Sequence, residues 1–171
     1  MDNASGFTHS DDLLLSPMKR FAFLCLAFCL LTSGQVFADS PLEIRLVVAP
    51  GTPGAVKTPW GEDETVYCAK EPLLDHKAVA EATVLSIGAR EPSWEVEVRF
   101  NERGKAAFAK ATTDHKGEQF GVLSNGKLLV VARVMSPITS GTLRISGNLT
   151  KEEATDLAAV IQAAVPKAVN P

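Results

Sequence analysis

The stretch from Ser136 to Asp156, S-P-I-T-S-G-T-L-R-I-S-G-N-L-T-K-E-E-A-T-D, decides the fold. It predicts a turn, a short strand over Thr142–Ile145, a second turn at Gly147-Asn148 and a strongly capped helix start. Thr150 and Glu153 have the spacing of a capping box, in which each side chain accepts a hydrogen bond from the backbone N–H of the other residue. Apolar residues then recur at helical spacing, so one face of this last helix is expected to be buried; they are Ala154, Leu157, Ala158, Ile161 and Val165.

The elements just upstream are also clear. Trp94–Phe100 alternates apolar and charged residues, which predicts a strand with one core face and one solvent-facing side. Asn101 follows as the N-cap of a helix that runs to about Thr113. Asn125-Gly126 predicts a tight hairpin turn, because both residues tolerate positive φ. Leu128–Ala132 has no polar residue and is predicted to be a central strand covered on both faces.

The first half of the chain is less regular. Pro50–Pro59 is predicted to be a loop, because its prolines fix φ and lack a backbone donor. Asp75 is the expected N-cap of a short helix over His76–Ala82, and a turn is expected at Gly88–Ser93. The remaining apolar segments are predicted to be strands: Leu42–Val48, Thr65–Lys70 and Thr83–Ile87.

This order of elements predicts an α+β fold, with an antiparallel or mixed sheet and two main helices packed on one face. Residues 39–66 are expected to hold the N-terminal strand and the Pro/Gly-rich loop. Residues 67–165 are expected to form the α+β domain proper, and residues 166–171 a tail.

The N-terminal region has the features of a secretory signal. Basic residues at Met18-Lys19-Arg20 precede the apolar run Phe21–Leu31, and the small-residue site Val36-Phe37-Ala38 follows. We therefore predict a signal peptide over residues 1–38 and cleavage between Ala38 and Asp39, with translation that starts at Met18 or at Met1. The apolar run is shorter than the roughly twenty residues that span a membrane, so the processed chain is expected to carry no stable membrane span.

Charge and cysteine content narrow the classes of function. The formal net charge is −3, and no basic patch points to nucleic acid or an anionic membrane surface. Cys25 and Cys29 lie in the predicted signal, so the processed chain keeps only Cys68. A single cysteine cannot form an internal disulfide, and Cys68, within an apolar segment, is predicted to be a buried, inert thiol.

The processed chain carries no recognisable catalytic pattern. His76 and His115 are its only histidines, and no H-x-x-H, H-E-x-x-H or C-x-x-C spacing accompanies them. Serines and Asp75 could complete a triad by composition alone, but no G-x-S-x-G turn is present. Glu95 and Glu97 share one strand face and are interpreted as solubilising. We therefore predict no catalytic, cofactor-binding or metal-binding residues and no enzyme.

Several segments, in order along the chain, resemble the periplasmic head of SecD, the protein-export membrane subunit. Ser136–Asp156 is the most specific of them. The others are Leu42–Val47, Lys70-Glu71-Pro72-Leu73-Leu74, the strand-to-helix junction Val98–Lys105 and the turn Asn125-Gly126-Lys127. The resemblance implies a head-like α+β fold that contacts exported chains, beside a membrane part that uses the proton gradient. Because no transmembrane segment follows the signal, the isolated chain is not expected to use that gradient.

Three functions are compatible with these features. The leading hypothesis is an exported, periplasmic or secreted protein-binding module of the bacterial envelope, whose partners are exported chains or envelope and translocon subunits. Its contacts are expected from the loops Pro50–Glu64 and Met135–Thr142, or from a hairpin or outer strand that pairs with an extended client. The alternatives are a structural or inhibitory envelope protein that self-associates through a sheet edge, and a small periplasmic hydrolase that uses His76 or His115. The oligomeric state and the partner are not specified by the sequence.

Overall fold

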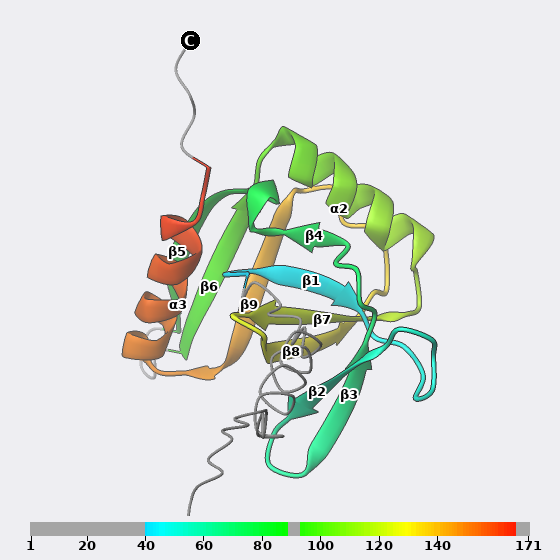
Figure 1. Cartoon of the computed structure of the whole chain (residues 1–171). Helices are drawn as coiled ribbons and strands as arrows, with labels where there is room; N and C mark the ends of the chain where they lie inside the picture. The colour runs from blue at the N-terminus through cyan, green and yellow to red at the C-terminus, as the bar shows by residue number, and fades with distance from the viewer. Residues whose placement is uncertain (1–39, 89–92, 167–171) are drawn as a thin grey trace, which may run out of the picture. The chain divides into compact units, whose positions relative to one another are not determined.

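The strands form three separate antiparallel sheets (Figure 1). The structure is a computed structural model that describes residues 40–88 and 93–166. Its elements in chain order are β1 (Glu43–Leu46), β2 (Val56–Trp60), β3 (Glu64–Cys68), β4 (Leu74–Asp75), the 3-10 turn η1 (His76–Ala78), β5 (Val79–Ile87), β6 (Ser93–Phe100), α2 (Glu102–Asp114), β7 (Gln119–Ser124), β8 (Lys127–Arg133), β9 (Thr142–Leu149) and α3 (Lys151–Ala163).

The sheets have the orders β4-β1-β7-β8, β2-β3 and β5-β6-β9. Helix α3 packs on β5 and β6, whereas α2 lies against η1, β4 and β6. The α+β class, the antiparallel pairing and the two main helices are thus as predicted. The arrangement differs in one respect, because the strands divide among three sheets and α2 contacts two of them, through β4 and β6.

Strand β6 has the predicted alternation. Val96 and Val98 are fully buried and Phe100 is nearly so, while Arg99 is exposed. The ring of Phe100 packs against Phe108 of α2, with centroids 4.9 Å apart. The apolar face of β6 is therefore the centre of the core, and it connects the β5-β6-β9 sheet to α2.

Helix α2 begins at the predicted cap. The Asn101 side-chain oxygen accepts a hydrogen bond from the Gly104 N–H at 2.9 Å, and its amide donates to the Lys77 carbonyl at 2.9 Å. Gly104 is buried and faces Ala78, so closely that a Cβ on Gly104 would lie 2.3 Å from the Ala78 carbonyl oxygen. The absence of a side chain at Gly104 lets the helix approach η1.

The β7–β8 hairpin confirms the Asn-Gly prediction. Ser124 pairs with Lys127 across a two-residue turn, in which Asn125 has φ of 47° and Gly126 has φ of 75°. Positive φ at both central residues is the type I′ conformation, whose twist matches that of the flanking strands.

The capping box of α3 is also confirmed. The Thr150 hydroxyl accepts from the Glu153 N–H at 3.1 Å, and the Glu153 carboxylate accepts from the Thr150 N–H at 2.8 Å. Ala154, Ala158 and Ile161 are buried, as the helical spacing predicts. The turn expected at Gly147-Asn148 is instead an irregularity within β9, where Asn148 takes a positive φ of 46°.

The capping box makes stability depend on acid. Hydrogen bonds from the Thr150 backbone and side chain, opposed by partial desolvation and aided by the Lys127 charge, lower the pKa of Glu153. Because the folded pKa lies below the unfolded value, about 4.3 for glutamate, this stabilisation is present at neutral pH and is lost as the pH falls from the unfolded pKa through the folded one. We expect Glu153→Gln to remove that part of the acid dependence. Urea unfolding midpoints across acidic and neutral pH test this; Glu152→Gln, an exposed neighbour, is the control, and identical pH profiles for wild type and Glu153→Gln would contradict it.

The helix predicted over His76–Ala82 is wrong. The Asp75 cap exists, since its carboxylate accepts from the Lys77 N–H at 2.9 Å, but only the 3-10 turn η1 follows before β5 begins at Val79. A bulge between Val79 and Glu81 lets Val79 and Ala82 both point inward. Two inward residues three positions apart imitate helical spacing, which explains the error.

Pro50–Pro59 is only partly a loop, because Val56–Trp60 pairs with β3 along its whole length. Pro59 is tolerated there because β2 pairs with β3 alone among the described strands, and an edge strand can lack a backbone donor. β3 crosses residue 66, where the predicted domain boundary lies. The division at residues 66 and 67 remains a prediction. The turn expected at Gly88–Ser93 falls mostly on residues 89–92, outside the described residues, as do tail residues 167–171.

β8 was predicted to be central, but it lies at the edge of its sheet and pairs only with β7 among the described strands. Leu129, Val130 and Val131 are half-buried, because β2 and β9 lie against β8 without pairing with it. These neighbouring elements account for the apolar residues of β8, and its outer edge has no strand partner among the described strands.

Candidate functional site

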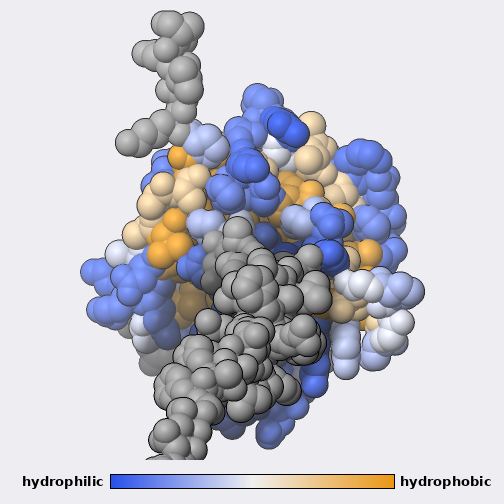
Figure 2. Space-filling view, viewed as in Figure 1, coloured by the Kyte–Doolittle hydropathy of each residue, from blue (hydrophilic) through white to orange (hydrophobic). Residues whose placement is uncertain are grey.

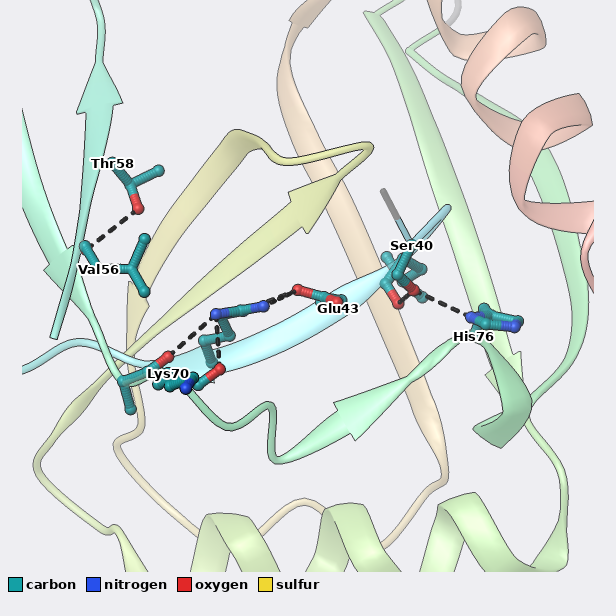
Figure 3. Close-up of polar contacts among 9 residues, drawn as sticks. Ser40, Glu43, Val56, Thr58, Lys70 and His76 are labelled. Carbon is teal, nitrogen blue, oxygen red and sulfur yellow. Dashed lines mark hydrogen bonds and ion pairs between the residues drawn. The ribbon is translucent and has the colours of Figure 1, made fainter. Parts of the chain in front are cut away.

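Both histidines serve local structure. Nδ1 of His76 lies 2.9 Å from the Ser40 hydroxyl, and Figure 3 shows the two side chains side by side. Nδ1 of His115 lies 3.3 Å from the Glu118 carboxylate, and its ring meets Phe120 edge-on. Within residues 40–88 and 93–166, no cluster of three histidine, cysteine or acidic side chains could hold a metal ion.

Cys68 is completely buried and free, as predicted. Burial raises the pKa of its thiol, and a hydrogen bond from Thr58 and the charge of Arg45 only partly oppose this. The folded protein therefore keeps Cys68 protonated at neutral pH, whereas a reactive cysteine needs an accessible thiolate.

We expect iodoacetamide to modify Cys68 only when the protein unfolds. Mass spectrometry after a fixed labelling time, across a urea series, should show modification rising with the unfolding curve followed by circular dichroism. Rapid labelling in the absence of urea would contradict this burial. Because the precursor also contains Cys25 and Cys29, peptide-level assignment is needed.

The solvent-facing side of the β5-β6-β9 sheet carries paired charges. Glu97 pairs with Arg144 at 3.1 Å, and Arg99 pairs with Glu81. These ion pairs join neighbouring strands across the sheet and leave no pair of free carboxylates for acid–base chemistry at Glu97. The solubilising interpretation of this face agrees with the geometry.

Two hollows lie beside α2 in the described part of the chain. The first, which we call the α2–β8 groove, has a volume of about 260 Å³ and lies between α2, the β7–β8 hairpin and the segment leading to β9. Its lining is mostly apolar, with polar groups from Thr112, Arg133 and Ser136; the apolar residues are Ile44, Phe108, Phe120, Val122, Ala132, Val134, Met135, Ile138 and Leu143.

One side of the α2–β8 groove is formed by the predicted contact loop Met135–Thr142. The buried Thr112 hydroxyl donates to the Phe108 carbonyl and accepts from the Ile138 N–H, both at 2.9 Å. This bond holds the loop against α2. Met135 at the rim is 73% exposed, and an exposed, flexible thioether next to an apolar hollow is suited to varied apolar side chains.

The second hollow, the α2–β4 cavity, has a volume of about 350 Å³. Its walls combine the Pro72-Leu73-Leu74 segment with Ala107 of α2, and Asp75, Lys77 and Arg103 add charges of both signs. Figure 2 shows apolar surface between α2 and β4, with hydrophilic residues around it. Gly104 also lines this cavity, so the close approach of α2 to η1 sets its width.

The outer edge of β8 adjoins the first hollow. Val134 exchanges backbone bonds with Gly117 and Glu118 on the β7 side, so by the alternation of an antiparallel ladder Arg133 and Val131 direct their backbone groups the other way. An edge strand of this kind can pair with an extended segment. The groove and the neighbouring edge of β8 therefore offer apolar contact and backbone pairing to an extended segment.

Sequence reasoning missed the buried ion pair on β1. Glu43 and Arg45 are the charged residues of this strand, yet Arg45 is only 7% exposed. Its guanidinium contacts the Glu43 carboxylate at 2.6 Å and donates to the carbonyls of Lys70 at 2.8 Å and Ala69 at 3.2 Å (Figure 3). The carbonyl acceptors lie just after β3, too far along the sequence for the alternation to indicate them. The predicted cleavage residues Ala38 and Asp39 lie outside the described residues.

Comparison with known proteins identifies a family whose profile matches this chain. The profile of the family described as SecDF, P1 head subdomain, matches residues 55–165. The chain belongs to this family. The matched residues include Ser136–Asp156 and the residues that line the two hollows, except Ile44 of β1, which precedes the match.

Relatives and solved structures agree with this P1 head assignment. The protein translocase subunit SecD of Acidaminococcus fermentans is 35% identical over 101 residues, which cover 59% of this chain and 22% of that subunit. SecD of Treponema pallidum is 34% identical over 102 residues, covering 60% and 17%. The chain thus spans about a fifth of the length of these relatives.

Two solved structures share the fold of this P1 head. One is SecDF described as a membrane component that enhances protein export, with a TM-score of 0.56, 18% identity and coverage of 89% of this chain and 71% of that one. The other is SecDF in a super-membrane-facing form, with a TM-score of 0.55, 18% identity and coverage of 87% and 21%. Among the described residues, no helix is long and apolar enough to cross a membrane.

Proposed function

We propose that this chain is an exported P1-head protein that binds extended apolar segments of exported chains and acts as an accessory to protein export or to an envelope complex. The observation that carries the proposal is the α2–β8 groove beside the open edge of β8, in a member of the P1 head family. An extended client can place an apolar side chain in the groove and pair its backbone with β8.

The proposed location is the periplasm or the exterior of a bacterial cell. It rests on the signal pattern before Ala38 and on relatives named as protein translocase subunits. Mass spectrometry of the N-terminus of the exported protein tests it. A mature chain that starts at Asp39 would support cleavage after Ala38, and retention of residues 18–38 would contradict it.

Binding is tested at Met135. A model peptide in extended form, apolar and fluorescently labelled, is titrated with the purified protein and followed by anisotropy. We expect Met135→Asp to weaken binding by about tenfold or more, because it places a charge where burial of methionine contributes about 1.5 kcal/mol or more. Met135→Leu keeps an apolar side chain and is expected to bind within a few-fold of wild type.

Client identity is tested in the cell. A photo-reactive amino acid at position 135, on the rim of the α2–β8 groove, is expected to crosslink to newly exported chains. The matched control is position 110, where Lys110 on α2 is exposed and pairs with Asp114, away from the groove lining. Equal crosslinking from both positions, or none from position 135 while the peptide fails to bind, would overturn the proposal.

A further inference from the structure

The outer edge of β5 differs from the other long edges of the described sheets. β5 runs for nine residues without proline, and Glu81 is its only charged residue. Glu81 is already paired with Arg99 of the neighbouring strand. Natural edge strands are normally protected by lysines, prolines or short length, and β8 has Lys127 and Arg133 at its ends. β5 has none of these three protections, and its bulge between Val79 and Glu81 lies at one end of the strand, before Val84.

The direction of the β5 backbone groups follows from the ladder. Phe100 of β6 donates its N–H to Gly141, on the β9 side. The backbone N–H and C=O groups of the even-numbered β6 residues therefore point to β9, and those of the odd-numbered residues point to β5. Glu97 is opposite Thr83, so the backbone groups of Thr83 point to β6. Val84 and Ser86 therefore direct their N–H and C=O groups to the open edge.

Helix α3 confirms this direction and borders the edge. The N–H of Ala82 donates to the Gln162 side-chain oxygen at 2.9 Å, so it is turned away from β6. Thr155, Ala159 and Gln162 lie at i, i+4 and i+7, on the flank of α3 beside β5, and all three are exposed and uncharged. Lys151, at the start of the helix, is held over the Trp94 ring at 5.5 Å.

We propose that β5 is the interface of a symmetric dimer, in which it pairs antiparallel with β5 of a second copy. The edge is self-complementary: with a two-fold axis at Val84, Glu81 lies opposite Ile87 of the other copy and no like charges meet. Ile87 is 41% exposed in one copy. The two α3 flanks then face each other on one side of a continuous sheet, and the small side chain of Ala159 permits their close approach.

A second copy fits this edge better than a charged partner, because Glu81, the one charged residue of β5, is already paired with Arg99. In the dimer, Ala82 exchanges its contact with Gln162 for the Ser86 carbonyl of the other copy. In a single copy the Gln162 side chain accepts the hydrogen bond of the Ala82 N–H, so this donor of the edge has a partner before the dimer forms.

Sedimentation equilibrium of the protein purified after expression of the full chain tests the dimer. Wild type is expected at twice the monomer mass. Ser86→Pro removes an outward N–H while leaving the β6 ladder intact, and we expect at least a tenfold weaker dimer. Ser86→Ala keeps the N–H and should behave as wild type. If Ser86→Pro does not fold, Ala159→Lys on the bordering flank takes its place, with Val160→Lys on another side of α3 as control.

Amide exchange measured residue by residue gives an independent readout. The Val84 and Ser86 amides are expected to exchange slowly in wild type and to lose protection in Ala159→Lys. A monomer at all concentrations with fast exchange at both amides would overturn the proposal. So would a dimer that survives both substitutions, or a monomer whose Val84 and Ser86 amides are protected only when the extended model peptide is added.

Discussion

Gly104→Ala is expected to lower the free energy of unfolding by about 3 kcal/mol, the upper part of the range for overpacked sites. An alanine Cβ would lie 2.3 Å from the Ala78 carbonyl oxygen and 2.8 Å from the Ala78 Cβ. Both atoms belong to a short segment held by Asn101, which bonds the carbonyls of Lys77 and Ala78. Neither side can move without breaking these bonds.

The sign of the stability change in Gly104→Ala shows whether helix propensity or close packing dominates at this position. At an unconstrained helix position, glycine to alanine stabilises by about 1 kcal/mol, so helix propensity alone predicts a gain. Close packing predicts a loss about three times as large. Urea unfolding of Gly104→Ala measures the difference, with Lys105→Ala, exposed on the same turn, as the control. A more stable Gly104→Ala protein would show that α2 does not pack on η1 as described.

Arg45→Ala is expected to cost about 3–5 kcal/mol, because removing one partner leaves a buried charge uncompensated. The Glu43 side chain is only 14% exposed, and the Ala69 and Lys70 carbonyls would lose their guanidinium donor. The end of β3 would then no longer be held to β1 by a side chain. The measurement is chemical unfolding at fixed ionic strength.

A double-mutant cycle isolates the ion pair from the carbonyl bonds. Glu43→Ala leaves Arg45 its two carbonyl acceptors, so it should cost less than Arg45→Ala. The double variant should be more stable than the sum of the two single losses predicts, because the buried carboxylate is absent. Strict additivity would mean that the Glu43–Arg45 contact does not contribute to folding.

Local chemistry made part of the fold predictable from the sequence. The Asn125-Gly126 turn, the Asn101 cap and the Thr150–Glu153 capping box each depend on residues within four positions of one another. Their geometry is set by backbone preferences and short hydrogen bonds, which the sequence contains. The alternation of Trp94–Phe100 is as direct, because one face of that strand meets the core.

What the sequence did not reveal depends on distant parts of the chain. The bulge at Val79 shifts the inward residues of β5 by one position, so Val79 and Ala82 have the spacing of buried residues on a helix. β8 is apolar because β2 and β9 cover it from other sheets, and nothing in its own residues indicates that it lies at an edge. The sequence predicted only one wall of the α2–β8 groove, the contact loop Met135–Thr142, because the opposite wall comes from α2.

The order in which the chain is made bears on β1. This strand lies between β4 and β7 in its sheet, yet it is the first of the described strands in chain order. The Pro41 carbonyl before β1 accepts a hydrogen bond from the Ser124 hydroxyl, 83 positions later, and the Ser40 carbonyl accepts from the Asn125 N–H. Loop closure over such a distance carries an entropic cost before any contact is gained. The bonds between this opening segment and the β7–β8 hairpin therefore form late, whereas β1 can pair with β4 as soon as the chain has reached Asp75.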